Sequence, residues 1–163
     1  MTIEPGQPIP SVPVKHVTET GVADATSVDV LGSGTVVFFT VPGAFTPTCH
    51  LNHLPGYLAA AEKLKAAGVD TIVCGTVNDH HVVKAWAEST GALGTIEFIA
   101  DGLGKLASAL GLERDLTAGG LGQRFTRSSL LIRNGVVEAV NVEGAPGEVT
   151  SSGAPAMLEA LSA

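Results

Sequence analysis

The chain has 163 residues, of which 45% are apolar, and this size predicts one domain, residues 1–163, whose core needs no disulfide cross-links. Its 16 acidic and 9 basic residues give a formal charge of −7, and the basic residues form no cluster, which argues against a nucleic-acid partner or an anionic membrane. No apolar stretch approaches the roughly 20 residues of a membrane span, and the N-terminus lacks a secretory pattern. With only two cysteines, the chain is expected to be cytoplasmic.

The beginning of the chain is rich in proline. Four prolines between Pro5 and Pro13 predict an extended N-terminal tether that lies over the fold and adds no element to the core. Residues 35–41 follow a Gly-Ser-Gly turn and are β-branched or aromatic throughout. This run predicts a central strand that is covered on both faces and ends next to Pro42.

Residues 47–67 carry apolar side chains at intervals of three and four, which predicts a helix with one buried stripe. Gly68 is expected to end this helix. Pro55 lies inside it, lacks a backbone N–H, and places its ring against the carbonyl of Leu51. The sequence therefore predicts a kink at Pro55.

The first turn of the same helix contains a cysteine. Thr46 has the hydroxyl of a good N-cap, and Pro47 suits the first helical position because an N–H there would have no partner. Cys49 then lies among unpaired backbone N–H groups at the positive end of the helix dipole, which favours thiolate over thiol. Its position predicts a reactive cysteine, whereas a free cysteine elsewhere is most often a small apolar core residue.

Strands and helices alternate along the middle of the chain. The pattern predicts a strand at 71–77, a helix capped by Asp79, a strand at 95–100 and a short helix at 103–110. This alternation implies parallel strands joined by right-handed crossovers.

The last third of the chain predicts a loop, a hairpin and a helix. Residues 112–123 contain three glycines and are expected to form a loop, long enough to be functional, that leads to Arg124 and Arg127. Residues 127–133 and 136–142 flank Asn134-Gly135, a strong hairpin signal. A helix is expected after Ser152 or Ala154, where a proline follows.

The stretch Pro42-Gly43-Ala44-Phe45-Thr46-Pro47-Thr48-Cys49 resembles the signature of the peroxiredoxins, and specifically of their type II, peroxiredoxin-five-like branch. The resemblance covers nearly the whole chain and continues through His53-Leu54-Pro55-Gly56-Tyr57, Val77-Asn78-Asp79, Lys84-Ala85-Trp86, Ala100-Asp101-Gly102 and Gly120-Leu121-Gly122. It implies a thioredoxin-like α/β fold, with a central mixed β-sheet flanked by helices and an N-terminal extension. It also implies a cofactor-free thiol peroxidase that reduces hydrogen peroxide and alkyl hydroperoxides through a Cys49 sulfenic acid.

The resemblance also implies roles for the residues around Cys49. Thr46 is expected to hold the peroxide, and Pro42 to shield the thiolate from water. The catalytic arginine matches Arg127, although Arg124 is an alternative because the family's arginine is usually followed by phenylalanine, as Arg124 is here. Arg127 is preferred, since hairpin register sets which side chain reaches the active edge of the sheet.

The second cysteine and the reductant leave alternatives open. Cys74 lies in a predicted buried strand and could be an inert core thiol or the resolving thiol. The family implies a reductant from outside the chain, either glutathione with glutaredoxin or thioredoxin, because no fused glutaredoxin domain follows. It also implies a homodimer, for which the candidate surface comprises residues 43–45, 79–81 and 112–121.

Three other functions compete with this interpretation of Cys49. A thioredoxin-type oxidoreductase is disfavoured because no Cys-x-x-Cys motif is present. A metal site formed by Cys49 and the histidines lacks a second pair at ligand spacing; these histidines are His50, His53, His80 and His81. A non-catalytic redox sensor or chaperone-like protein on the same scaffold would use the same cysteine, so steady-state turnover must distinguish it from a peroxidase.

Overall fold

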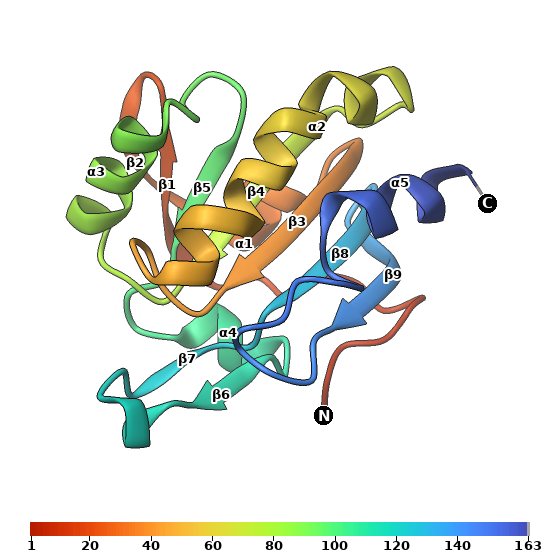
Figure 1. The fold of residues 1–163 in the computed structure, drawn as a ribbon. Coiled ribbons are helices and arrows are strands. Elements are labelled where there is room, and N and C mark those ends of the chain that lie inside the picture. Colours follow the sequence, from red (N-terminus) through yellow and green to blue (C-terminus); the bar gives the residue numbers. More distant parts are fainter. Residues whose placement is uncertain (163) are drawn as a thin grey trace.

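The computed structural model describes residues 1–162, which build a seven-stranded mixed sheet with helices on both faces (Figure 1). The strands of this sheet are β1 (Pro13–Thr18), β2 (Gly21–Thr26), β3 (Thr35–Val41), β4 (Thr71–Thr76), β5 (Glu97–Ala100), β8 (Ser128–Arg133) and β9 (Val136–Val142). Their order is β2-β1-β5-β4-β3-β8-β9, with β5, β4 and β3 parallel to one another at the centre. The predicted thioredoxin-like α/β architecture is confirmed.

The helices divide between the two faces of the sheet. One face is covered by α2 (Leu54–Ala66), α3 (His80–Thr90) and α5 (Ala154–Ser162). The other is covered by α1 (Ser27–Leu31), α4 (Lys105–Ala109) and the N-terminal segment. None of the helices in residues 1–162 has the length and apolar character needed to cross a membrane.

Strand β3 contributes to both cores, as its unbroken apolar run predicts. Val37 and Phe39 pack under α2, whereas Val36 and Phe38 pack on the opposite face. Successive side chains of a strand point to opposite sides, so a strand that is covered on both faces is apolar at most positions. The hairpin of β8 and β9 around Asn134 then pairs with β3 and extends the sheet.

The N-terminal segment is part of the core, so the prediction of a simple tether was wrong. Ile3 and Ile9 are buried in the core of the second face. Backbone N–H groups of Ile3, Gly6 and Ile9 donate to carbonyls of Leu110, Val137 and Gly135 over 2.8 Å each. The prolines remove only some backbone donors, and the remaining ones pair along β9 and the end of α4.

The hairpin of β1 and β2 and the short helix α1 were missed by the sequence patterns. β1 pairs with β5 and so widens the sheet by two strands, while α1 begins in a capping box of Thr26 and Asp29. Residues of β2 are largely exposed and therefore carry no apolar alternation. Without that alternation an edge strand gives a weak signal.

The region predicted as a loop contains a second, two-stranded sheet. It comprises β6 (Glu113–Asp115) and β7 (Gln123–Phe125), with a short 3-10 turn at Thr117–Gly119 between them. Leu112 and Phe125 are buried beneath it. Strands of three residues are too short to show a period, so composition alone suggested a loop.

Candidate active site

The site forms where β3 ends and the chain turns toward α2. Asn78 holds this turn, because its side-chain oxygen accepts hydrogen bonds from the Ala44 backbone N–H (2.9 Å) and the Thr76 hydroxyl (2.6 Å). Phe45 adopts a positive φ of 60°, which non-glycine residues rarely do. The carboxyl end of a central strand therefore delivers Thr46 and Cys49 in a strained, well-anchored turn.

The helix that carries Cys49 is irregular, but not in the way predicted. Cys49–His53 form a π-turn, in which the Leu54 N–H donates to the Cys49 carbonyl, and regular α2 follows. Pro55 cannot donate to the Leu51 carbonyl and crowds it, so the expected kink is expressed as a wider turn just before the proline. Cys49 and His53 are both buried in this turn.

Thr46 stands at the start of the helix, but its hydroxyl does not cap it in the predicted way. The Thr46 backbone carbonyl accepts the first helical bond, from the His50 N–H at 2.9 Å. The hydroxyl instead donates to the Gly43 carbonyl at 2.6 Å. Its proton is thus committed, and the hydroxyl oxygen is left to accept a hydrogen bond.

Arg127, immediately before β8, contacts Cys49 directly. Its Nη2 donates to the Cys49 Sγ at 3.0 Å, its Nη1 lies 2.9 Å from the His53 Nδ1, and its Nε donates to the Pro146 carbonyl at 2.9 Å. Only 1% of its surface is exposed. The guanidinium thus places a buried positive charge beside the sulfur.

His53 can be assigned as a neutral ring with one orientation. Its Nε2 lies 3.0 Å from the Ser152 carbonyl, which can only accept, so Nε2 carries the proton and Nδ1 accepts from Arg127. Burial, together with the nearby Arg127 charge and against the opposing effect of the Ser152 carbonyl, lowers the pKa of His53 to about 4. His53 therefore stays neutral at pH 7 and serves as an acceptor for the arginine.

Arg124, the alternative arginine, lies in β7 and does not touch Cys49. Its Nε donates to the Leu121 carbonyl at 2.8 Å and its Nη1 to the Pro42 carbonyl at 3.3 Å. A Cβ on Gly43 would approach this guanidinium to 2.9 Å, so the glycine leaves room for the arginine in its present position. Arg124 ties the β6–β7 region to the active-site turn.

The segment between β9 and α5 forms the back of the site. The Ser152 carbonyl accepts from His53 and also from the Tyr57 hydroxyl at 2.7 Å. The carboxylate of Glu143 accepts hydrogen bonds from Thr150 and Ser152. Burial by itself raises the pKa of Glu143, but these bonds outweigh it and lower the pKa to about 2.

Sequence reasoning missed most of these supporting residues. His53 and Tyr57 lay in a recognised motif, but His53 was considered only as a metal ligand. Glu143 and Ser152 gave no signal, because their partners are distant in the sequence.

The two cysteines are both free and buried. Cys74 faces the same core as Cys49, in β4 beside β3. Burial, followed by the nearby Cys49, raises the pKa of the Cys74 thiol well above its ordinary value. Cys74 therefore remains protonated and is a poor nucleophile in this structure.

The histidines singled out as possible ligands have separate partners. His50 Nδ1 accepts from the Trp86 Nε1–H at 3.0 Å, and the rings of His80 and His81 contact each other at a tilt, with centroids 4.2 Å apart. Among residues 1–162 no cluster of three or more His, Cys, Asp or Glu side chains could hold a metal ion.

A pocket of about 210 Å³ opens over Arg127 and Thr46. Its walls are mostly apolar and come from the active-site turn, the β6–β7 region and the segment after β9. The residues that line it are Pro42, Thr46, Pro47, Thr48, Leu116, Leu121, Arg127, Pro146 and Gly147. The pocket thus brings Arg127 and Thr46 into one small cavity.

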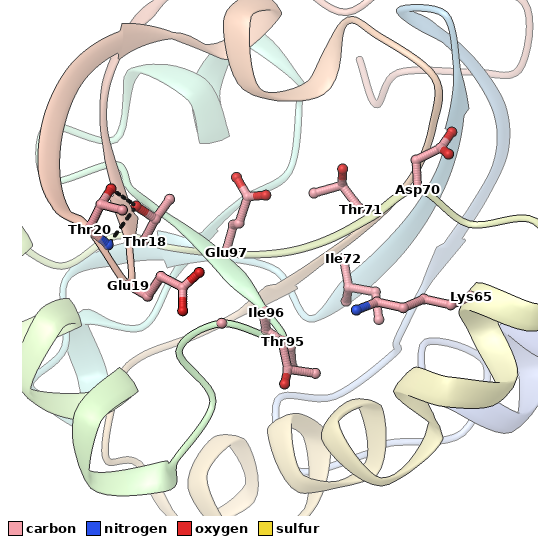
Figure 2. A pocket seen from close by; sticks show the side chains of 11 residues that line it. Thr18, Glu19, Thr20, Lys65, Asp70, Thr71, Ile72, Thr95, Ile96 and Glu97 are labelled. Carbon is pink, nitrogen blue, oxygen red and sulfur yellow. Dashed lines mark hydrogen bonds between the residues drawn. The ribbon is translucent and has the colours of Figure 1, made fainter.

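A second pocket lies at the opposite ends of the parallel strands (Figure 2). Thr71 and Glu97, which begin β4 and β5, line it together with Glu19, Asp70 and Lys65. It contains no cysteine and no buried cation, whereas ligands of α/β sheets bind at the carboxyl ends of the strands. Cys49 and Arg127 lie at the other end of these strands.

Comparison with known proteins identifies the family. The sequence matches the Redoxin family over residues 4–158. Peroxiredoxin-2C of rice (Oryza sativa subsp. japonica) is 52% identical over 126 residues, which are 77% of each chain. The chain belongs to the Redoxin family, as a peroxiredoxin. It is therefore a thiol-dependent peroxidase, and its relatives agree with the predicted type II branch.

Two further comparisons extend this result. The structure of reduced Prx3 from Vibrio vulnificus in complex with H2O2 superposes with a TM-score of 0.90 and 44% identity, covering 98% of this chain and 99% of that one. Mitochondrial peroxiredoxin-2F of Arabidopsis thaliana is 42% identical over 130 residues, 80% of this chain and 65% of its own length. Peroxiredoxins of this kind thus share both the sequence and the fold of the chain.

Proposed function

We propose that Cys49 is the nucleophile of this peroxidase and that Arg127, Thr46 and Pro42 form its peroxide site. The Cys49 thiolate attacks the terminal oxygen of a hydroperoxide, so an S–O bond forms while the O–O bond breaks. The cysteine is oxidised to a sulfenic acid, and the peroxide is reduced to water or an alcohol once the departing oxygen takes up a proton. The observation that carries this proposal is the 3.0 Å contact between the Arg127 Nη2 and the Cys49 Sγ.

Ionisation of the cysteine supplies only part of the acceleration. A free thiol is a few per cent ionised at pH 7, so full ionisation raises the thiolate only ~30-fold, about 2 kcal/mol. The remainder must come from groups that act on the breaking O–O bond. Arg127 offers positive charge to the departing oxygen, and the Thr46 hydroxyl oxygen accepts a hydrogen bond from the peroxide O–H. Pro42 keeps water away from the thiolate.

The test is a Cys49→Ser variant assayed for peroxide consumption with excess reductant. We expect no turnover and an unchanged circular dichroism spectrum, because a serine hydroxyl cannot form a sulfenic acid. Turnover by wild-type protein over many cycles also excludes a sensor that oxidises once. Residual peroxide consumption by Cys49→Ser would remove Cys49 as the nucleophile.

The reductant is proposed to come from outside the chain, as glutathione with glutaredoxin or as thioredoxin. Support comes from Cys74, which is fully buried in a central strand, with a raised pKa that disfavours its thiolate. Attack by an external thiol on the sulfenic acid releases water and forms a mixed disulfide, which a second thiol reduces. A disulfide between Cys49 and Cys74 is not needed for this cycle.

A Cys74→Ser variant assayed with each reductant tests the cycle. We expect turnover with glutathione and glutaredoxin to be retained. Complete loss with every reductant, together with a 49–74 disulfide in peptide maps of oxidised wild type, would make Cys74 the resolving thiol.

Assembly and compartment complete the proposal. The half-exposed Phe45 lies on the active-site turn and belongs to residues 43–45, one of the segments of the expected homodimer surface. Sedimentation at micromolar concentration should therefore show a dimer, and a monomer in both redox states would remove this part. We also propose the cytoplasm as the compartment, on the basis of the two free thiols.

A further inference from the structure

Glu143 lies directly opposite Arg127 at the end of the β8–β9 hairpin. Its backbone N–H donates to the Arg127 carbonyl at 2.9 Å, which continues the strand pairing by one residue. Residues opposite each other in an antiparallel pair present their side chains on the same face. Only 4% of Glu143 is exposed, and the salt bridges among residues 1–162 do not include it.

The carboxylate of Glu143 binds three consecutive residues on the far side of a loop. It accepts from the backbone N–H groups of Thr150 (2.7 Å) and Ser152 (2.8 Å), and from the hydroxyls of Thr150, Ser151 and Ser152. A carboxylate with this many donors is fully satisfied without a cation. The Glu143 side chain therefore joins the two ends of the segment 143–152.

This closed segment presents two carbonyls to the active site. The Pro146 carbonyl accepts from the Arg127 Nε, and the Ser152 carbonyl accepts from the His53 Nε2–H. His53 in turn accepts from the Arg127 Nη1. The guanidinium contacts Pro146, His53 and Cys49, and the positions of the first two depend on this segment.

We propose that Glu143 is a positioning residue for Arg127: its carboxylate fixes the segment 143–152, whose carbonyls orient the guanidinium toward Cys49. This inference rests on the proposed role of Arg127. The arrangement keeps the carboxylate on neutral donors, so the arginine keeps its positive charge for the thiolate and the peroxide. A direct carboxylate partner would offset that charge.

The test compares Glu143→Ala with Glu143→Gln. Alanine removes every acceptor, and we expect the rate of peroxide reduction to fall between about ten- and a hundredfold, as small misplacements of reacting groups do. The glutamine oxygen can still accept from both backbone N–H groups while its amide donates to the hydroxyls, so Glu143→Gln should recover most of the rate. A glutamine variant as slow as the alanine variant would contradict positioning through hydrogen bonds.

A second readout separates positioning from stability. The pH dependence of Cys49 alkylation by iodoacetamide, measured well below the melting temperature, should move to higher pH in Glu143→Ala, because a displaced guanidinium favours the thiolate less. Glu138→Gln is the matched control, since Glu138 lies on β9, just before Glu143 in the chain, and is exposed. An unchanged alkylation profile and rate in folded Glu143→Ala would overturn the proposal.

A double variant decides whether Glu143 acts through Arg127. If it does, adding Glu143→Ala to Arg127→Gln should cause no further loss of rate, whereas independent roles would give losses that multiply. Should Arg127→Gln alone have no effect, the proposed function fails rather than this inference. If Glu143→Ala does not fold, the double variant Thr150→Val with Ser152→Ala takes its place, because it removes only side-chain donors to Glu143. It should change the rate and the alkylation profile in the same direction as expected for Glu143→Ala. No change in either would overturn the proposal.

Discussion

On the face of the sheet that α1, α4 and the N-terminal segment cover, the Thr40 and Ser128 hydroxyls bond each other at 2.6 Å, and the buried carboxyl group of Asp101 accepts from the backbone N–H groups of Leu106 and Ala107 at the start of α4. On the face under α2 and α5, a guanidinium, an imidazole and a carboxylate are buried around Cys49. Burying charge costs stability unless every group is paired. The first face therefore stabilises the fold, and the second uses part of that stability to hold a reactive site.

Substitutions at two neighbouring residues of β3 should change the stability most, and they test the difference between the two faces. Phe38→Ala and Phe39→Ala should each lower the free energy of unfolding by about 3–5 kcal/mol, because both rings are fully buried. Phe38 packs edge-on against Phe125, whereas Phe39 stacks on Tyr57 with centroids 4.1 Å apart and lies 5.0 Å from the His53 ring. Urea unfolding measures the stability, and peroxide consumption by the folded protein measures the rate.

Only Phe39→Ala should also lower the rate of the folded enzyme. An equal loss of rate in Phe38→Ala would break the comparison, since that side chain faces away from the site.

The next effect concerns the two arginines. Arg127→Gln should lower the rate of peroxide reduction about 100- to 1,000-fold, as removal of one preorganised donor to a transition state does. Arg124→Gln should cost much less, because Arg124 binds carbonyls of Leu121 and Pro42 and does not reach the thiol. Equal or reversed losses in the same assay would move the catalytic role to Arg124.

The third effect is a loss of stability in acid. The pKa of His53 is about 4 in the folded chain and about 6.5 in the unfolded chain, so the unfolded chain binds more protons between these values. The free energy of unfolding should therefore fall as pH falls from 6.5 to 4, by about 3 kcal/mol in total.

Urea midpoints at several pH values measure this acid effect, and His81→Gln, at an exposed histidine, is the control. His53→Gln should remove the dependence, and its persistence in that variant would assign the effect to other groups. Below pH 4.5, protonation of Glu143, whose pKa is lowered to about 2, should reduce stability further.

The smallest effect is expected at the surface. Glu138 pairs with Arg133, and both side chains are about half exposed. Glu138→Gln should change the free energy of unfolding by less than about 1 kcal/mol and leave the rate unchanged, because water and salt screen exposed pairs. A loss of rate in this variant would show that the edge strand β9 itself contributes to the site, in addition to Glu143, which follows it.

The elements that could be predicted from the sequence are those whose structure depends on residues close by in the chain. The strand at 35–41, the Asn134-Gly135 turn and the helix start at Pro47 were predicted correctly, because strand burial, turn geometry and helix starts are encoded within about ten residues. The family resemblance predicted Cys49 and Arg127 as site residues, and the structure places them in contact. Periodicity failed where the chain was short of apolar alternation, as in β1, β2, β6 and β7.

The groups that surround the Cys49 thiol are far apart in the sequence and could be identified only from the tertiary structure. Arg127 lies 78 residues from Cys49 and 74 from His53, while Ser152 lies 99 residues from His53. Their meeting depends on the strand order that places β8 beside β3 and on the loop that Glu143 closes. The hydrogen bonds of a buried polar group are satisfied by whatever the fold brings near it, and no local pattern records those partners.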